Sequence, residues 1–259
     1  MVIGGGLLGL EAAYGLKQRG MNVTVLHLMD RIMERQLDGR ASRMLRQSIE
    51  EKGINIITEA NTEALIGKDG HVNQVRLKNG IVLDADLVVF AVGIRPNIAL
   101  AQSAGLRCNR GILVNDTMQT FDPSIYAVGE CIEHRNQTFG LVEPLWGQAF
   151  ICATHLAEHG SLTFKSPTVP TQLKVSGVDV FSAGNFEPKE DYEDIILNDE
   201  KRQIYKRIII QKDKVIGAVL FGDTEDGMWY AELIADQTPI STFRNKLLFG
   251  KDFAMKKAG

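Results

Sequence analysis

The sequence has little cysteine, and its cysteines show no pattern. Its 259 residues include three, Cys108, Cys131 and Cys152, which lie more than twenty positions apart. This spacing gives no disulfide framework, no Cys-x-x-Cys redox pair and no zinc or iron–sulfur ligand set. We therefore expect no metal site and a reducing, cytoplasmic setting.

Long apolar runs and an excess of charge of one sign are also missing. The most apolar stretch, residues 81–94, is interrupted by Asp84 and Asp86, and it is shorter than the roughly 18–20 residues of a membrane span. The first residues have no signal-peptide pattern. A net charge of −3 and a pI near 6.0 argue against a nucleic-acid partner, which needs a clustered basic surface. We expect neither membrane nor nucleic-acid binding.

The first 95 residues alternate between strand and helix patterns. Residues 1–3 and 22–28 read as strands, and residues 7–19 and 38–52 read as helices, the second with Asp38 as its N-cap. A period of two and an Asn79-Gly80 turn predict an antiparallel insertion over residues 54–83. Residues 86–91 read as a strand buried on both faces. The predicted fold is α/β, a Rossmann-like three-layer dinucleotide-binding domain over residues 1–95.

Two further regions follow. In residues 96–165 the pattern predicts a helix over 97–104, strands over 112–114 and 125–128, and a helix over 145–159. At Ser166 the composition changes, and Pro167 and Pro170 mark a linker. Residues 166–259 read as a C-terminal α+β domain of five antiparallel strands and two helices, about 226–236 and 240–249.

The most informative motif lies between the first strand and the first helix. Gly4, Gly6 and Gly9 form G-x-G-x-x-G, which allows a tight turn, a close approach of a diphosphate to bare backbone, and close packing of helix on sheet. The helix that starts at Leu7 and Leu8 offers free N–H groups and a positive dipole end to that diphosphate. The alternative is a glycine-rich turn without a ligand.

The sequence leaves the choice of coenzyme open. An acid usually ends the second strand of such a fold and binds the adenosine ribose, but His27 occupies that place, and Asp30 follows three residues later. His27 is either a ribose contact or a plain surface histidine. Because Arg31 and Arg35 are close by, NADPH remains an alternative to NADH, which we favour.

Two later segments resemble a known family. Residues 89–97, Val-Phe-Ala-Val-Gly-Ile-Arg-Pro-Asn, and residues 120–130, Thr-Phe-Asp-Pro-Ser-Ile-Tyr-Ala-Val-Gly-Glu, resemble motifs of pyridine nucleotide-disulfide oxidoreductase-type flavoproteins. Glu130 replaces the usual Asp. Together with residues 131–134, 26–38 and 175–181, it makes the chain look most like the large subunit of NAD(P)H-dependent nitrite reductases.

This resemblance implies cofactors and residue roles. It implies NAD(P)H and FAD, with hydride transfer from the nicotinamide to the flavin in nitrate assimilation, and with alignment rather than an acid or base as the protein's contribution. Residues 96–165 would be the returning half of the FAD-binding domain. The residues implied to contact the cofactors are Gly4, Gly6 and Gly9 (diphosphate), Glu11 and Gly93 (nicotinamide), and Gly129, Glu130, Leu145 and Trp146 (flavin).

The family has two glycine loops, whereas this sequence contains one. We therefore expect an excised part of a larger enzyme, which binds FAD poorly and does not reduce nitrite alone. Its expected partners are a dinucleotide and the remaining domains of the parent enzyme. Exposed apolar surface around Ala127, Val128 and Trp146 would also permit a homo-oligomer.

Other functions are open at this point. A stand-alone ferredoxin- or rubredoxin-reductase-like flavoprotein and a non-catalytic dinucleotide-binding domain are the alternatives. His155-x-x-Glu158-His159 matches a zinc-peptidase pattern but also suits an ordinary helix C-terminus. We expect Cys131 to be a buried spectator. We expect the acidic residues Asp191, Glu193 and Asp194 to form a solvated loop, with the docking of a redox partner as the alternative.

Overall fold

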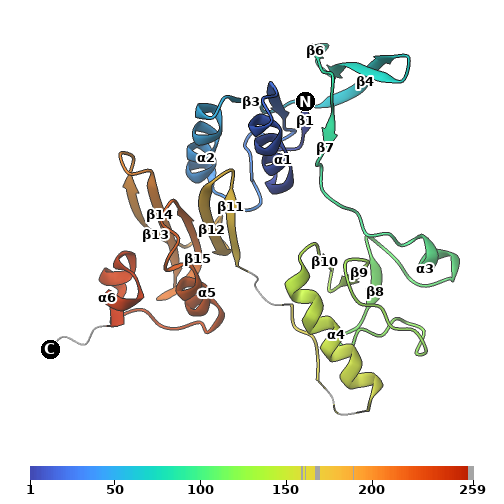
Figure 1. Cartoon of the computed structure of the whole chain (residues 1–259). Coiled ribbons are helices and arrows are strands. Elements are labelled where there is room, and N and C mark those ends of the chain that lie inside the picture. Colours follow the sequence, from blue (N-terminus) through green and yellow to red (C-terminus); the bar gives the residue numbers. More distant parts are fainter. Residues whose placement is uncertain (159, 161, 167–169, 189, 256–259) are drawn as a thin grey trace. The chain divides into compact units, whose positions relative to one another are not determined.

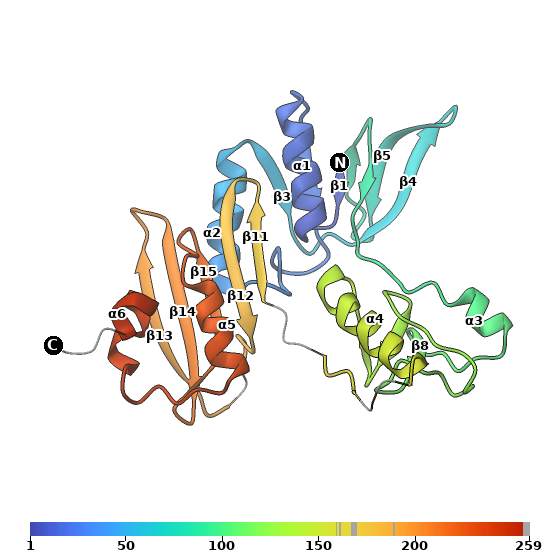
Figure 2. The same cartoon turned by 60° about the horizontal axis from the view of Figure 1, so that its bottom comes forward.

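The structure, a computed structural model, describes residues 1–158, 160, 162–166, 170–188 and 190–255. The chain forms two compact units (Figures 1 and 2). One unit joins residues 1–93 to residues 170–259, and the other comprises residues 94–169. Among the described helices, none combines the length and the apolar character that crossing a bilayer requires.

A parallel sheet forms the centre of the first unit. Its strands are β1 (Val2–Ile3), β2 (Val23–Leu26), β3 (Ile54–Ile57) and β7 (Val89–Phe90), in the order β3-β2-β1-β7. Helices α1 (Leu7–Gln18) and α2 (Gly39–Glu51) cover one face. Neighbouring strand residues point to opposite faces, so Val2 and Val25 join the core with the helices while Ile3 and Leu26 join a second core.

An antiparallel sheet of β4 (Thr62–Lys68), β5 (His71–Leu77) and β6 (Val82–Asp84) covers the other face through Val75 and Leu77. The three-layer prediction is thus confirmed. The predicted start of the antiparallel insertion at Ile54 is wrong, because Ile54–Ile57 pairs in parallel with β2. A period of two does not distinguish the two pairings.

The predicted strand over residues 86–91 is much shorter than expected. The observed strand β7 contains Val89 and Phe90, and the Phe90 side chain is 59% exposed. Because β7 lies at the edge of the sheet and pairs with β1 alone among the described strands, its apolar residues are not covered on both faces.

The C-terminal part of this unit is a second, antiparallel sheet. Its strands are β11 (Thr171–Val175), β12 (Val178–Gly184), β13 (Glu193–Asp199), β14 (Ile204–Gln211) and β15 (Lys214–Phe221), in the order β11-β12-β15-β14-β13. One face packs against α1 and α2 through residues such as Val219 and Phe221, and the other face packs against α5 (Gly227–Ala235) through Ala218 and Leu220.

Two short helical elements follow α5. They are η1 (Arg244–Phe249), a 3-10 helix, and α6 (Lys251–Met255). The predicted helix over 240–249 is wrong in part, because η1 covers only its second half.

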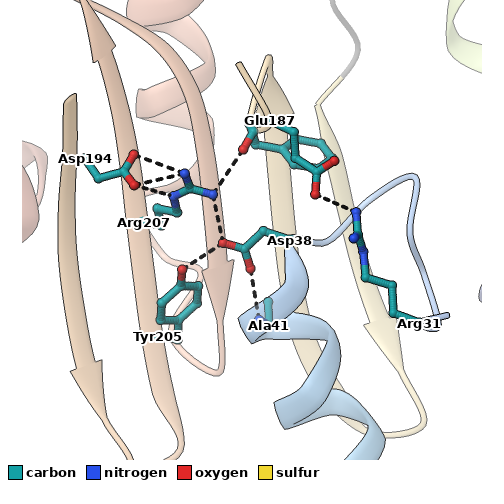
Figure 3. Close-up of polar contacts among 8 residues, drawn as sticks. Arg31, Asp38, Ala41, Glu187, Asp194, Tyr205 and Arg207 are labelled. Carbon is teal, nitrogen blue, oxygen red and sulfur yellow. Dashed lines mark hydrogen bonds and ion pairs between the residues drawn. The ribbon is translucent and has the colours of Figure 1, made fainter. Parts of the chain in front are cut away.

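Asp38 joins the N-terminal helices to this sheet (Figure 3). Its Oδ1 accepts a hydrogen bond from the amide of Ala41 at 2.9 Å, which caps α2 as predicted. Its Oδ2 accepts from the Tyr205 hydroxyl at 2.7 Å and lies 3.2 Å from Nη1 of Arg207, which also pairs with Asp194. Burial raises the pKa of Tyr205 and the bond to Asp38 raises it further, so the hydroxyl stays a donor. The predicted solvated loop is wrong for Glu193 and Asp194, which lie in the strand Glu193–Asp199, whereas Asp191 is exposed and precedes the strand.

The second unit has its own small core. Its sheet has the order β10-β9-β8, with β8 (Ile112–Val114), β9 (Ile132–His134) and β10 (Gln137–Thr138), flanked by α3 (Ala99–Ser103) and α4 (Val142–Leu156). The predicted strand over 125–128 is wrong: this segment makes one isolated bridge, from Tyr126 to Gln119. Helix α4 begins three residues earlier than predicted, which places Pro144 in the first turn, where its missing N–H is not needed.

Because Asp38 makes several buried contacts, removing its carboxylate should strongly lower the stability of the fold. Asp38→Ala should lower the free energy of unfolding by about 2–3 kcal/mol, since it removes a helix cap, leaves the buried Tyr205 hydroxyl without its acceptor and removes one of the two carboxylates paired with Arg207. Glu200→Ala is the control, because Glu200 is an exposed partner of Arg40 between the same parts of the chain; it should cost less than about 1 kcal/mol. Equal effects in chemical denaturation would contradict the assigned role.

Candidate functional site

The carboxyl ends of three parallel strands meet at one edge of the central sheet. The glycine loop follows β1, His27 follows β2, and Gly93 lies shortly after β7. Ligands of open α/β sheets bind at such an edge. Gly93 has a positive φ of 92°, and a Cβ placed on it would meet no atom within 4 Å, so this end of the sheet is open there.

The three glycines of the motif differ in what their missing side chains permit. A Cβ on Gly4 would overlap the carbonyl of Ala91, and a Cβ on Gly9 would overlap the carbonyl of Gly4, so these two glycines allow close backbone packing. Around Gly6, by contrast, a Cβ would meet nothing within 4 Å. Gly6 therefore leaves open space beside the backbone, as the close approach of a diphosphate requires.

Helix α1 begins directly at this open space. Its N-cap is Gly6, which supplies no side-chain hydrogen bond, so the first-turn amides of Leu7, Leu8 and Gly9 have no partner from a cap. The side chain of Leu8 is 72% exposed, which leaves the loop accessible. Free amides together with the positive end of a 12-residue helix favour an anion at this place.

His27 packs against the glycine loop and is 8% exposed, so of the two alternatives the plain surface histidine is wrong, and the ribose contact stays a prediction. Its Nδ1 accepts a hydrogen bond from the Gly5 amide at 3.0 Å. Its Nε2 lies 3.1 Å from Oε2 of Glu34, a contact that the sequence did not reveal because the partner is seven residues away in a loop. The amide of Met33 donates to the Gly5 carbonyl at 3.0 Å, so the same loop holds both sides of Gly5.

The two arginines considered for NADPH binding have different surroundings. Nη2 of Arg31 lies 2.5 Å from Oε1 of Glu187, an ion pair visible in Figure 3. The side chain of Arg35 is 86% exposed and its Nε is 4.0 Å from Glu34. Arg31 is thus already paired within the protein, whereas Arg35 is in solvent.

Glu11 contacts the C-terminal part of its own unit. Its Oε1 accepts a hydrogen bond at 2.7 Å from the amide of Ser176, in the turn between β11 and β12. The hydroxyl of Ser176 reaches the Leu10 carbonyl at 3.4 Å. The predicted place of Glu11 beside the nicotinamide stays a prediction; the structure adds a contact that fixes the side chain.

In the second unit, a buried glutamine of α4 holds the Gly129–Glu130 turn. Gly129 has a φ of 106°, Glu130 is exposed, and the Gly129 amide donates to Oε1 of Gln148 at 2.8 Å. Gln148 is fully buried, and its Nε2 has no partner among the described residues. Sequence reasoning missed Gln148, since a glutamine inside a helix carries no signal of its own.

The start of α4 presents apolar side chains to the surface. Trp146 is 73% exposed and Val128 is 39% exposed, as predicted, whereas Leu145 and Ala127 are half-buried and pack against the core. Cys131 is also half-buried, so the prediction of a fully buried thiol is wrong.

The segment after Glu130 has a structural role. Glu133 is buried and accepts hydrogen bonds from Asn109 and from the amides of Arg110 and Gly111. Burial alone would raise the pKa of Glu133, but these donors outweigh it and hold the pKa below its usual range. The buried ring of His134 bonds to Asp116 at 2.8 Å, and Arg135 and His134 together lower the pKa of Asp116 to about 2.

His155, the first histidine of the zinc-peptidase pattern, makes a contact within the protein. Nδ1 of His155 lies 2.8 Å from the hydroxyl of Tyr126, so this ring nitrogen has a partner. His159 lies outside the described residues. Within the described part of the chain, no group of three or more His, Cys, Asp and Glu side chains is arranged to hold a metal ion.

Comparisons with known proteins cover both units. Residues 1–149 match the family "Pyridine nucleotide-disulphide oxidoreductase", and residues 170–238 match "Rubredoxin NAD+ reductase C-terminal domain". In Bacillus subtilis, "Nitrite reductase [NAD(P)H]" is 49% identical over 240 residues, which are 93% of this chain and 30% of the relative. The "Assimilatory nitrate reductase electron transfer subunit" of the same organism is 42% identical over 95% of this chain and 32% of the relative.

Solved structures show the same fold. A NAD-dependent persulfide reductase from A. fulgidus gives a TM-score of 0.83 at 29% identity, over 94% of this chain and 50% of that protein. A FAD-dependent pyridine nucleotide-disulphide oxidoreductase from Desulfovibrio vulgaris gives 0.80 at 28% identity, over 96% and 67%. The chain spans about a third of the length of the two B. subtilis relatives. The family model matches residues 1–149, which are more than half of the chain and include the glycine loop. The chain therefore belongs to the pyridine nucleotide-disulphide oxidoreductase family.

Proposed function

We propose that this chain is the NAD(P)H-oxidising electron-transfer module of a flavin-dependent nitrite reductase, with NADH as the favoured coenzyme. The observation that carries the proposal is the open space at Gly6 in front of the uncapped first turn of α1. The names of the two B. subtilis relatives support the link to nitrite and nitrate reduction.

The residues of the first unit fit a dinucleotide. Gly4, Gly6 and Gly9 would shape the loop, and the amides of Leu7 and Leu8 would bind the diphosphate at the positive end of α1. Gly93 and Glu11 would lie near the nicotinamide, where a glycine leaves room for the flat ring. His27 would contribute through Gly5, whose amide it holds.

The residues of the second unit fit part of a flavin site. Gly129 and Glu130 would face the ribityl and diphosphate groups, and Leu145 and Trp146 would lie beside the ring system. The buried Nε2 of Gln148, without a partner in the described part of the chain, fits a polar group that is supplied with the flavin. A bound FAD would supply the acceptor for the hydride of the reduced nicotinamide; the residues named here would bind and orient the two cofactors, and none is assigned as an acid or base.

The proposal includes partners and place. We propose that the chain works with further domains of a larger enzyme, which carry the electrons on to nitrite, and that it resides in the cytoplasm. The three free cysteines fit a reducing compartment. The exposed Trp146 supports contact with another domain or with a second copy of the chain.

A second candidate function rests on the C-terminal match. Residues 170–238 match the C-terminal domain of rubredoxin NAD+ reductases, so a reductase that passes electrons to a small iron–sulfur protein is the alternative. Both candidates use the same coenzyme loop and differ in the electron acceptor.

The coenzyme loop is tested by a matched pair of glycine variants. Gly6→Val should leave the melting temperature unchanged, because its Cβ meets nothing, and should weaken NADH binding by about tenfold or more, because the side chain fills the place of the diphosphate. Gly15→Val in the same helix, where a Cβ also meets nothing, should bind NADH normally. Equal NADH affinities of the two variants by isothermal titration calorimetry would contradict the proposal.

The flavin content of the purified chain tests the proposal that the second unit forms only part of a flavin site. Because the sequence has one glycine loop, the chain should purify with little flavin and show NADH-dependent dye reduction only after FAD is added. Stoichiometric flavin absorbance would contradict this expectation. NADH binding without dye reduction at saturating FAD would favour a non-catalytic dinucleotide-binding domain.

Gln148 should control the order of the flavin-facing turn. Gln148→Met removes the acceptor of the Gly129 amide, so hydrogen exchange at Gly129 should speed up by about tenfold, as expected for one lost hydrogen bond. Gln102→Met, an exposed glutamine on α3, is the control. Unchanged exchange at Gly129 would show that Gln148 does not hold this turn.

A further inference from the structure

In this chain a histidine stands where dinucleotide-binding folds usually have the acid that binds the adenosine ribose. Both ring nitrogens of this histidine already have hydrogen-bond partners in the protein. His27 directly follows β2, where dinucleotide folds place an acid for the adenosine ribose. Its Nδ1 accepts from the Gly5 amide and its Nε2 contacts Glu34. Neither nitrogen is therefore free for a ribose hydroxyl, and another group must supply the missing acceptor.

The hydrogen bonds assign the tautomer of His27. The Gly5 amide is a donor, so Nδ1 must offer its lone pair and the ring proton must be on Nε2. Nε2 then donates to Oε2 of Glu34 at 3.1 Å. The histidine thus links the glycine loop to a carboxylate, and it fixes where that carboxylate lies.

Glu34 is held close to the coenzyme loop by its neighbour as well. The amide of Met33, the preceding residue, donates to the Gly5 carbonyl at 3.0 Å. The side chain of Glu34 remains 24% exposed, so the carboxylate is in reach of solvent and of a ligand. Among the described residues, the contact of its Oε1 is with the exposed Arg35 at 4.0 Å, so this oxygen is open to a further donor.

The positive charges around Glu34 do not cancel its effect. Nη2 of Arg31 pairs with Oε1 of Glu187, so this cation already has an acid partner, although its buried Nε has no hydrogen-bond partner among the described residues (Figure 3). Arg35 is 86% exposed, so its charge is screened by water and salt. A phosphate placed beside Glu34 would thus meet a carboxylate, while Arg31 is already paired with an acid and the charge of Arg35 is screened.

We propose that Glu34, held by His27 as a positioning residue, is the acid that selects the coenzyme. Its Oε1 accepts from the 2′-hydroxyl of the adenosine ribose, and its charge repels a 2′-phosphate, so the chain prefers NADH to NADPH. This inference rests on the proposed function and specifies the coenzyme of that site. A carboxylate seven residues beyond the usual position performs the selection.

The test compares NADH and NADPH affinities of Glu34→Gln with those of the unchanged chain, by isothermal titration calorimetry. Glutamine keeps the shape and an acceptor for His27 but removes the charge. The unchanged chain should prefer NADH by about tenfold or more, and the variant should lose about tenfold of that preference, mainly by binding NADPH more tightly. Glu63→Gln, an exposed acid on β4 of the same unit, makes the same charge change and should alter the ratio by less than about twofold.

The outcomes separate this inference from the function on which it rests. If the unchanged chain binds NADH but Glu34→Gln keeps the same ratio as Glu63→Gln, the role of Glu34 is wrong and the coenzyme site stands. A preference of the unchanged chain for NADPH would also overturn it. If the unchanged chain binds neither coenzyme, the proposed function itself fails, and the inference fails with it.

Discussion

The segment of residues 27–38 holds Gly5 through both its amide and its carbonyl, and the coenzyme loop depends on these two contacts. His27 accepts from its amide and Met33 donates to its carbonyl. The amides that follow then begin α1 without a cap and stay free, so the loop is ordered before any ligand arrives. The same segment ends at Asp38, which bonds to Tyr205 and Arg207 of the C-terminal sheet. The C-terminal residues Tyr205 and Arg207 therefore support the segment that holds the glycine loop.

Local rules explain why much of this arrangement could be predicted from the sequence. The glycine motif, the Asp38 cap of α2 and the antiparallel strands up to Phe221 each follow from neighbouring residues, and the three-layer fold follows from their order. The boundaries of the elements depend on more than local rules. Ile54–Ile57 has the alternation of an antiparallel strand but pairs in parallel, and η1 occupies only half of an apolar stretch that read as an α-helix.

Contacts between distant residues explain what the sequence did not reveal. The pairing of His27 with Glu34 depends on how a loop returns to the sheet edge, and the bond from Ser176 to Glu11 joins residues 165 positions apart. In the sequence Gln148 is an ordinary polar residue of a helix, and its role follows only from the hydrogen bond that it accepts from the Gly129 amide. The segment 125–128 is rich in strand-forming residues, yet β9 takes the place beside β8. In each case the outcome depends on a residue that is distant in the sequence, and no rule of residue spacing predicts that contact.

The central claim is that a diphosphate meets the bare amides after Gly5. Two-dimensional NMR of the amide groups during titration with NAD⁺ tests it most directly, because each amide of the loop reports separately. We predict the largest shift changes at Gly6, Leu7 and Leu8, with the Gly5 amide remaining bonded to His27. An unchanged spectrum, or changes confined to residues away from the start of α1, would contradict the claim.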